Sequence, residues 1–259
     1  MSENKAIEYL TEFRLSWKDL SILPDDQKAS LAIFSFAVSE VNALMKMFLL
    51  SNHSSIGEPA IDQMVSIQRN TILRVWSAKI FEFSVFLTYG GKKKTTSDPD
   101  LLQLATESLA KFDALKTGQG FAFAQNIRHE STNHYSLSAA KGNIKHMSSG
   151  TNCDIFMHEK TGNSFYPMGE SVMFMGRFSR HNRPSEHDND LSVVVDAWID
   201  WLIKATSWMQ EVFDSFFELL KTRHFPDRFA TERMYWIDPI FVGHADERKM
   251  PIFLRTSPK

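Results

Sequence analysis

The residues best suited to chemistry lie in one short run of the chain, Arg128-His129-Glu130-Ser131-Thr132-Asn133-His134-Tyr135. Arginine keeps its positive charge, and its planar fork of N–H donors matches the oxygens of a phosphate. Histidine titrates near neutral pH, so it can give or take a proton there. An arginine and a histidine that work together could grip and cleave a phosphodiester without a metal ion. The run therefore predicts a catalytic pair, Arg128 and His134.

A zinc site is an alternative for the same run, because His129-Glu130 followed by His134 has the residue types of the metalloprotease helix motif. Zinc-binding histidines on a helix lie four positions apart, on one face. His129 and His134 are five positions apart, so they point about 140° away from each other around a helix. The spacing argues against zinc, and we expect neither a metal nor another cofactor.

Helical geometry indicates how the run could form a site. Tyr135 follows Arg128 by seven positions, so the two would lie on one face. Glu130 and His134 are four positions apart, which lets the carboxylate orient the imidazole. Arg128 and His134 would diverge by about 120° on a regular helix. They could converge if the helix bends at residues 131–133, or if a partner helix or a second subunit completes the groove.

Arg128, His129 and His134 form an arrangement of arginine, polar residue and then histidine, with five residues between Arg128 and His134. This arrangement resembles the signature of HEPN domains (higher eukaryotes and prokaryotes nucleotide-binding). The resemblance implies an all-helical, commonly dimeric protein, and many members are metal-independent endoribonucleases of toxin and defence systems. It implies that Arg128 stabilises the phosphorane charge and that His134 acts as general base or acid. The commonest toxin form carries a tyrosine two residues after the histidine, whereas Tyr135 follows at once.

The same resemblance supplies expectations for the neighbouring residues and for partners. His129, Asn133 and Tyr135 are expected to bind the RNA strand, and Glu130 to support the site. RNA is then the substrate, a second copy of the chain completes a homodimer, and an antitoxin or another regulatory protein is a further candidate partner.

Composition is typical of a globular cytoplasmic protein. The chain has 259 residues, of which 43% are hydrophobic, and no uninterrupted apolar run reaches the length of a membrane helix. Its formal net charge is −2, so any binding of nucleic acid must use local patches. Cys153 is the only cysteine, which excludes an internal disulfide and suggests a reducing compartment. We expect no membrane partner.

The first 147 residues predict a helical bundle. Apolar residues at three- and four-residue spacing predict an amphipathic helix over residues 3–20. Pro24 and the acidic pair after it mark the start of a helix that runs to about residue 51. Loop and turn residues then separate three more helices, which span about residues 60–89, residues 99–115 and the run that carries Arg128.

The long helix over residues 60–89 is the natural neighbour of the Arg-His run. Charged side chains interrupt its apolar pattern at Arg69, Arg74, Lys79 and Glu82. Such charges are most often a solvated face. The alternative is that Glu82 pairs with Arg128 or with a histidine and fixes it in the groove.

The chain changes character after residue 147. Short apolar runs around a turn at residues 161–163 predict a hairpin or small meander over 153–178. Residues 190–221 predict a long helix whose wide aromatic stripe suits either the core or a second copy. The tail beyond residue 235 looks extended and could pair with the mid-chain strands.

These patterns predict a mainly α fold, a helical bundle with a small β hairpin or sheet from the middle and C-terminal segments. Residues 1–147 would form the bundle that bears the Arg-His run. Residues 148–259 would add the β element, the long helix and the tail, packed on the same core. Two functions follow. One is a metal-independent endoribonuclease, and the other is a non-catalytic helical protein in which the Arg-His segment is structural or binds a partner.

Overall fold

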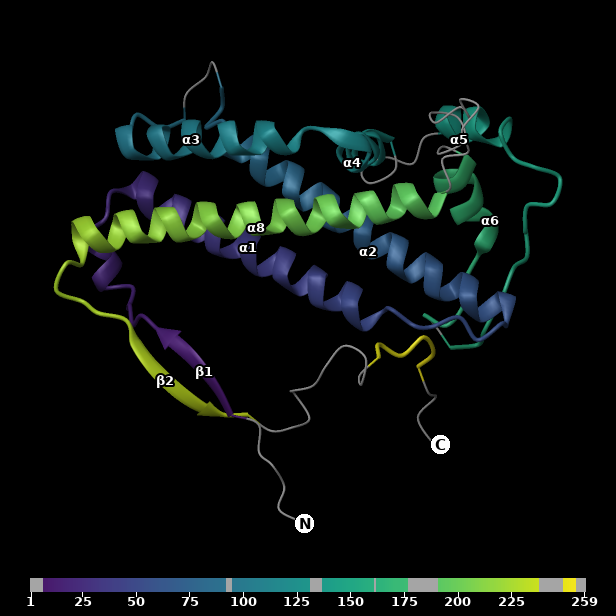
Figure 1. Cartoon of the computed structure of the whole chain (residues 1–259), viewed down its shortest axis with the longest axis horizontal. Coiled ribbons are helices and arrows are strands. Elements are labelled where there is room, and N and C mark those ends of the chain that lie inside the picture. Colours follow the sequence, from purple (N-terminus) through teal and green to yellow (C-terminus); the bar gives the residue numbers. More distant parts are fainter. Residues whose placement is uncertain are drawn as a thin grey trace, which may run out of the picture.

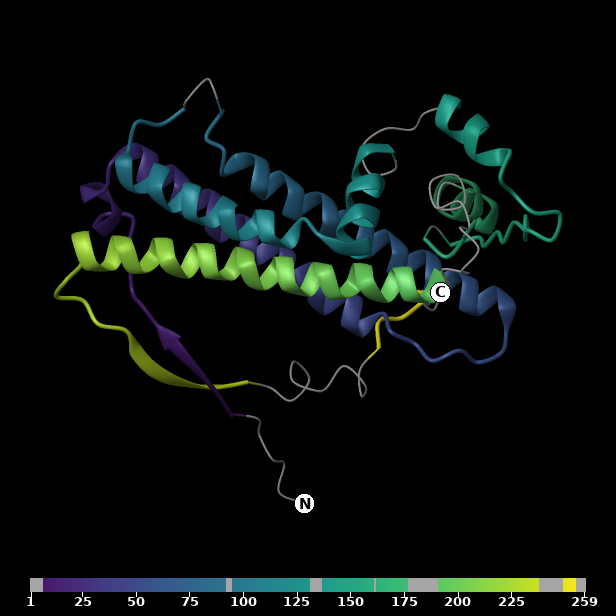
Figure 2. The same ribbon diagram turned by 45° about the horizontal axis from the view of Figure 1, so that its top comes forward.

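A computed structural model describes residues 7–91, 95–130, 137–160, 162–176, 191–237 and 249–254. Helices dominate this part of the chain, and two short strands form one antiparallel sheet (Figure 1). The predicted mainly α fold with a small sheet is therefore confirmed. Figures 1 and 2 both show the sheet standing apart from the helices.

Helices α1 (Asp25–Leu50), α2 (Pro59–Phe86) and α3 (Pro99–Leu115) begin and end close to the predicted positions. Proline occupies the first helical position of α2 and α3, where its missing N–H costs nothing. The Asp98 carboxylate caps α3 by accepting hydrogen bonds from the N–H groups of Asp100 and Leu101. Local sequence therefore sets these boundaries.

Helix α8 (Leu191–His224) packs against α1, α2, α3 and α4 (Gly118–Glu130). Its wide aromatic stripe faces the core, since Trp198, Trp201 and Trp208 are all buried. Buried apolar residues of α8 and of the first four helices belong to one hydrophobic cluster. Two tryptophans also link α2 and α8 reciprocally, through hydrogen bonds from Trp76 Nε1 to Thr206 Oγ1 (2.8 Å) and from Trp198 Nε1 to Ser77 Oγ (2.9 Å).

Gly120 permits the close contact between α4 and α8. A Cβ atom at this position would overlap the carbonyl oxygen of Ala197 and would lie 2.6 Å from its carbonyl carbon. Both atoms belong to the backbone of α8, so no side-chain rotation could relieve the overlap. Gly120 lies in the first turn of α4, where the two helices approach each other.

The second half of the predicted mid-chain β element is helical. Residues Ser171–Met175 form a π-helical turn, η2, directly after the short helix α6 (Pro167–Glu170). The ring of Phe174 lies 5.8 Å from that of Phe123, against the bundle, and this packing outweighs the local strand preference. The hairpin is reduced to one antiparallel bridge between Phe156 and Phe165. Helix α5 (Leu137–Ile144) packs against η2.

The predicted helix over residues 3–20 is also wrong, because strand β1 (Ile7–Glu12) and the 3-10 turn η1 (Asp19–Ile22) occupy this region. Strand β1 pairs with β2 (Thr231–Trp236) in antiparallel register. Backbone hydrogen bonds to a strand more than two hundred residues away override the helical spacing of the apolar residues. The partner of the C-terminal strand is therefore the N-terminus, not the mid-chain segment.

The last described residues, 249–254, return to the helices. The Met250 N–H donates to the carbonyl of Leu50 at the end of α1, at 2.8 Å. The Asn163 side chain exchanges two hydrogen bonds, each of 2.9 Å, with the backbone of Leu254. The tail thus meets the mid-chain loop through one amide side chain.

By length and composition alone, α1 could cross a membrane, and it is the one described helix that could. Its most apolar 18-residue window has a mean hydropathy of 1.5, with 22% of the window buried. A core helix passes the same test, and Phe34, Val38 and Val41 of α1 are buried in the bundle.

We expect the turn that follows β1 to make stability depend on pH. Asp19 accepts hydrogen bonds from Arg228 and, at 2.7 Å each, from the N–H and the hydroxyl of Ser16. These bonds, that of Arg228 first, hold the pKa of Asp19 well below its usual range. The stabilisation of the fold by these hydrogen bonds is therefore present above the pKa of Asp19 in the unfolded chain, about 4, and is lost as pH falls below that value.

The Asp19→Asn variant should accordingly lose less stability than the wild type between about pH 4 and about pH 2. Urea unfolding at a series of pH values measures the difference. Equal slopes for the two proteins would show that the Asp19 contacts do not stabilise the fold.

Candidate functional site

Arg128 lies in the last turn of α4, and its guanidinium is placed over an aromatic ring. The carbon atom at its centre is 5.1 Å from the ring centroid of Phe81 on α2. Phe121, seven residues earlier on the same face of α4, lies 6.0 Å from the same ring. The side chain is half-buried and makes no hydrogen bond or ion pair with a described residue. A positioned cation whose N–H donors are not taken by any described residue suits the binding of a phosphate.

The other residues of the predicted site are only partly described. The backbones of His129 and Glu130 belong to α4, but their side chains are outside the description. Asn133, His134 and Tyr135 lie outside the described residues altogether. The meeting of Arg128 with His134 therefore stays a prediction.

Glu82, the predicted supporting residue on α2, lies beside a lysine of its own helix. Its carboxylate is 3.8 Å from Lys79 Nζ, which also contacts Glu40 of α1 at 3.1 Å. Glu82 forms no ion pair with Arg128, although both residues are described. The solvated-face interpretation therefore fits Glu82, whose side chain is 58% exposed.

The solvated-face interpretation is wrong for Arg69 and Arg74, which lie earlier on α2. Arg74 Nη1 lies 2.7 Å from Glu170 Oε1, and the two side chains are only 16% and 15% exposed. Its guanidinium also lies over the ring of Phe174, at 5.8 Å. Arg74 is buried because α6 and η2 cover this face of α2, and no helix was predicted in that segment.

Arg69 is half-buried and forms no ion pair with an acidic residue of the described chain. Its guanidinium lies 5.1 Å from the ring centroid of Phe48, and its Nε is buried without a hydrogen-bond partner. Burial lowers the pKa of Arg69, an effect that the negative charge of Asp196 partly offsets. No ion pair joins Arg69 and Asp196 in the described structure.

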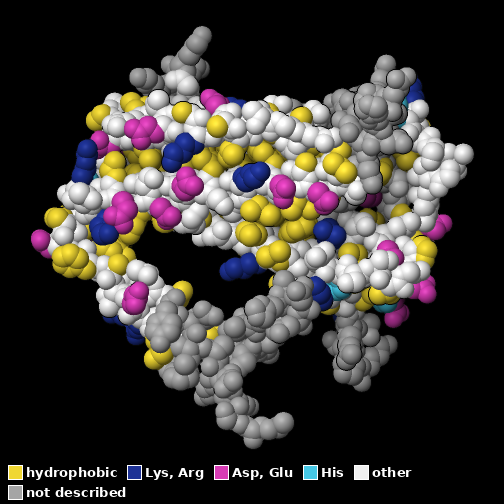
Figure 3. Space-filling view, viewed as in Figure 1, with side chains coloured by type: hydrophobic (Ala, Val, Ile, Leu, Met, Phe, Trp, Pro, Cys, Tyr) yellow, Lys and Arg dark blue, Asp and Glu magenta, His cyan; other side chains and the backbone are white. Residues whose placement is uncertain are grey.

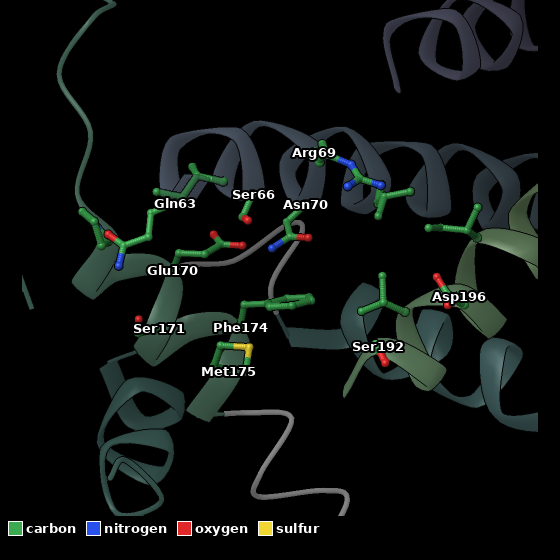
Figure 4. A pocket seen from close by; sticks show the side chains of 15 residues that line it. Gln63, Ser66, Arg69, Asn70, Glu170, Ser171, Phe174, Met175, Ser192 and Asp196 are labelled. Carbon is green, nitrogen blue, oxygen red and sulfur yellow. The ribbon is translucent and has the colours of Figure 1, made fainter. Parts of the chain in front are cut away.

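Arg69 and Asp196 both line a cavity of about 570 Å³, here named the α2–η2–α8 cavity after the elements that form it. Figure 4 shows the two residues approaching it from opposite walls, with Asn70 and Glu170 facing each other between α2 and α6. Both apolar and polar side chains line it, namely Gln63, Ser66, Ile67, Arg69, Asn70, Leu73, Pro167, Glu170, Ser171, Phe174, Met175, Ser192, Val195, Asp196 and Ile199.

Sequence reasoning missed this cavity, although one signal was present. Arg69 and Arg74 interrupt an otherwise apolar helix, and buried arginines need partners. The partner of Arg74 is Glu170, and the cavity beside Arg69 is closed by Asp196 of α8, about a hundred positions or more along the chain. Spacing within one helix could not reveal them.

No group of three or more His, Cys, Asp or Glu side chains suited to a metal ion occurs in the described part of the chain. Comparison of the sequence with protein-family models and with curated proteins, and of the structure with solved structures, gives no match.

Proposed function

We propose that the protein is a metal-independent endoribonuclease of HEPN type in which Arg128 and His134 act on one phosphodiester. The observation that carries the proposal is the placement of Arg128 over Phe81, at the end of α4 and directly before the segment with His134. A cation held on a ring is oriented, yet keeps its N–H donors available. The helical architecture is consistent with the same family.

In this reaction the 2′-oxygen of a ribose attacks the neighbouring phosphorus, and the bond to the 5′-oxygen breaks. His134 takes the proton of the 2′-hydroxyl, and the 5′-oxygen gains a proton from solvent. Arg128 stabilises the negative charge that builds up on the phosphorane. The products are a 2′,3′-cyclic phosphate and a 5′-hydroxyl, and Glu130 would orient the imidazole while His129, Asn133 and Tyr135 hold the strand.

The charge of the molecule bears on how RNA would bind. Lys and Arg side chains are interspersed with Asp and Glu on the face drawn in Figure 3, and they form no single basic patch among the described residues there. The formal net charge of −2 likewise provides no general attraction. Binding would therefore be local to the Arg128 end of α4, and a second copy of the chain would supply the rest of the groove.

The test is cleavage of mixed RNA in excess EDTA by the wild type, Arg128→Ala and His134→Ala. We expect each substitution to slow cleavage about a hundredfold or more, because each removes a transition-state contact or a proton acceptor. Arg233→Ala is the matched control, since its guanidinium also lies over a ring, that of Tyr235, but on the distant strand β2. Cleavage that survives both substitutions, or no cleavage by the wild type, would remove the proposal.

A second candidate function is non-catalytic binding of a small molecule, which the α2–η2–α8 cavity favours. Its volume of about 570 Å³ lies within the range of ligand pockets, and it combines apolar walls with a few polar groups.

A further inference from the structure

Two buried polar atoms at the α2–η2–α8 cavity have no hydrogen-bond partner in the described structure, Arg69 Nε and Gln63 Oε1. One is a donor and the other an acceptor. Buried polar atoms in folded proteins are almost always satisfied, so such an exception needs an explanation. The two atoms show that the α2 wall of the cavity holds polar groups that the described part of the protein does not fully pair.

The charges around the cavity limit which chemical class of ligand could bind there. Glu170 is already neutralised by Arg74, at 2.7 Å. Arg69 and Asp196 remain as one positive and one negative group on opposite walls, with no ion pair between them (Figure 4). A ligand that carries one charge of each sign would match both, because a carboxylate suits the guanidinium fork and an ammonium suits the Asp196 carboxylate.

Other ligand classes fit less well. A phosphate dianion would meet a single unpaired guanidinium and would also face the carboxylates of Glu170 and Asp196. A hydrocarbon would leave Arg69 and Asp196 without a partner of opposite charge in the cavity. The remaining wall is apolar, formed by Leu73, Phe174, Met175, Val195 and Ile199, so the rest of the ligand should be apolar too.

We propose that the α2–η2–α8 cavity binds a small zwitterion, an α-amino acid with an apolar side chain. Its carboxylate would contact Arg69 and its ammonium Asp196. The side chain would lie against the apolar wall. This assignment deepens the small-molecule alternative and does not depend on RNA cleavage, since none of its residues belongs to the Arg128 run.

The experiment is calorimetric titration of the full-length protein with the standard L-amino acids at millimolar concentration. We expect at least one apolar amino acid to bind. Its decarboxylated amine and its deaminated acid, for leucine isoamylamine and 4-methylpentanoate, should each bind at least about tenfold more weakly, because each lacks one charge-assisted contact. No binding by any amino acid, or equal binding of the deaminated acid, would overturn the proposal.

Substitutions of two lining residues test whether the amino acid binds in this cavity. Arg69→Gln and Asp196→Asn should each weaken amino-acid binding about tenfold or more, since each removes one partner of the zwitterion. Arg233→Gln on β2 should leave the affinity unchanged, as an arginine remote from the cavity. Circular dichroism and the melting temperature check that the Arg69 and Asp196 variants fold. A folded Arg69→Gln protein with wild-type affinity would place the ligand elsewhere and contradict the proposal.

Discussion

Replacing Trp198 with alanine should lower the free energy of unfolding by about 4 kcal/mol, the loss typical of a large buried aromatic side chain. Trp198 is fully buried, and its ring lies 5.1 Å from that of Phe123 and 6.1 Å from that of Phe174. The substitution would leave a cavity where α2, α4, η2 and α8 meet. It would also deprive Ser77 Oγ of the indole N–H that it accepts at 2.9 Å.

Urea unfolding followed by circular dichroism measures this change. Trp17→Ala is the control, because its side chain is 78% exposed and its removal should alter stability by no more than about 0.5 kcal/mol. Similar losses for Trp17→Ala and Trp198→Ala would contradict the packing described for α8.

The Gly120→Ala variant should be less stable than the wild type by about 2 kcal/mol. Alanine favours a helix over glycine by about 1 kcal/mol, so helix propensity alone predicts the opposite sign. The new methyl group would overlap the backbone of Ala197, and forcing α4 away from α8 should cost about 3 kcal/mol. The steric effect is the larger of the two.

Gly169→Ala separates these contributions. Gly169 also lies in a helix, α6, but a Cβ there would meet no atom within 4 Å. This substitution should be neutral or stabilise the protein by up to about 1 kcal/mol. Chemical unfolding of both variants gives the comparison, and a stabilised Gly120→Ala protein would show that α4 and α8 do not approach closely at this point.

The parts of the fold that the sequence predicts well are those set by local chemistry. Proline and its acidic neighbours start α1, and Asp98 with Pro99 starts α3. The aromatic stripe of α8 has the helical period over many turns, so no strand could bury it on one face. These signals depend on residues within a few positions of each other.

The failures depend on partners that are distant in sequence. Leu10 and Phe13 have helical spacing with their neighbours, yet residues 7–12 are a strand because β2 supplies its hydrogen bonds. Residues 172–175 look like a strand, but they coil because Phe174 packs between the helices. No local pattern contains this information.

The candidate site also has some features that local sequence predicts and others that depend on residues distant in the chain. Spacing on one helix predicts that Arg128 shares a face with Tyr135, which lies outside the described residues. Phe121, seven positions before Arg128, lies against the same Phe81 ring. Spacing could not predict which ring Arg128 would cover. The α2–η2–α8 cavity combines three stretches of chain that only the tertiary packing brings together, so Arg69 was expected to belong to a solvated face.

The register of the two strands also determines how the protein would respond to mechanical force. Ile7 pairs with Trp236 and Glu12 with Thr231, so both outer chain segments leave the sheet at the same end. A pull between Ile7 and Trp236 would open the ladder one residue pair at a time, as a zipper opens, instead of shearing all pairs at once. Tension would reach α1 and α8 only after the last pair had separated. The two-stranded sheet therefore protects the tryptophan-rich core from a weak force applied between Ile7 and Trp236.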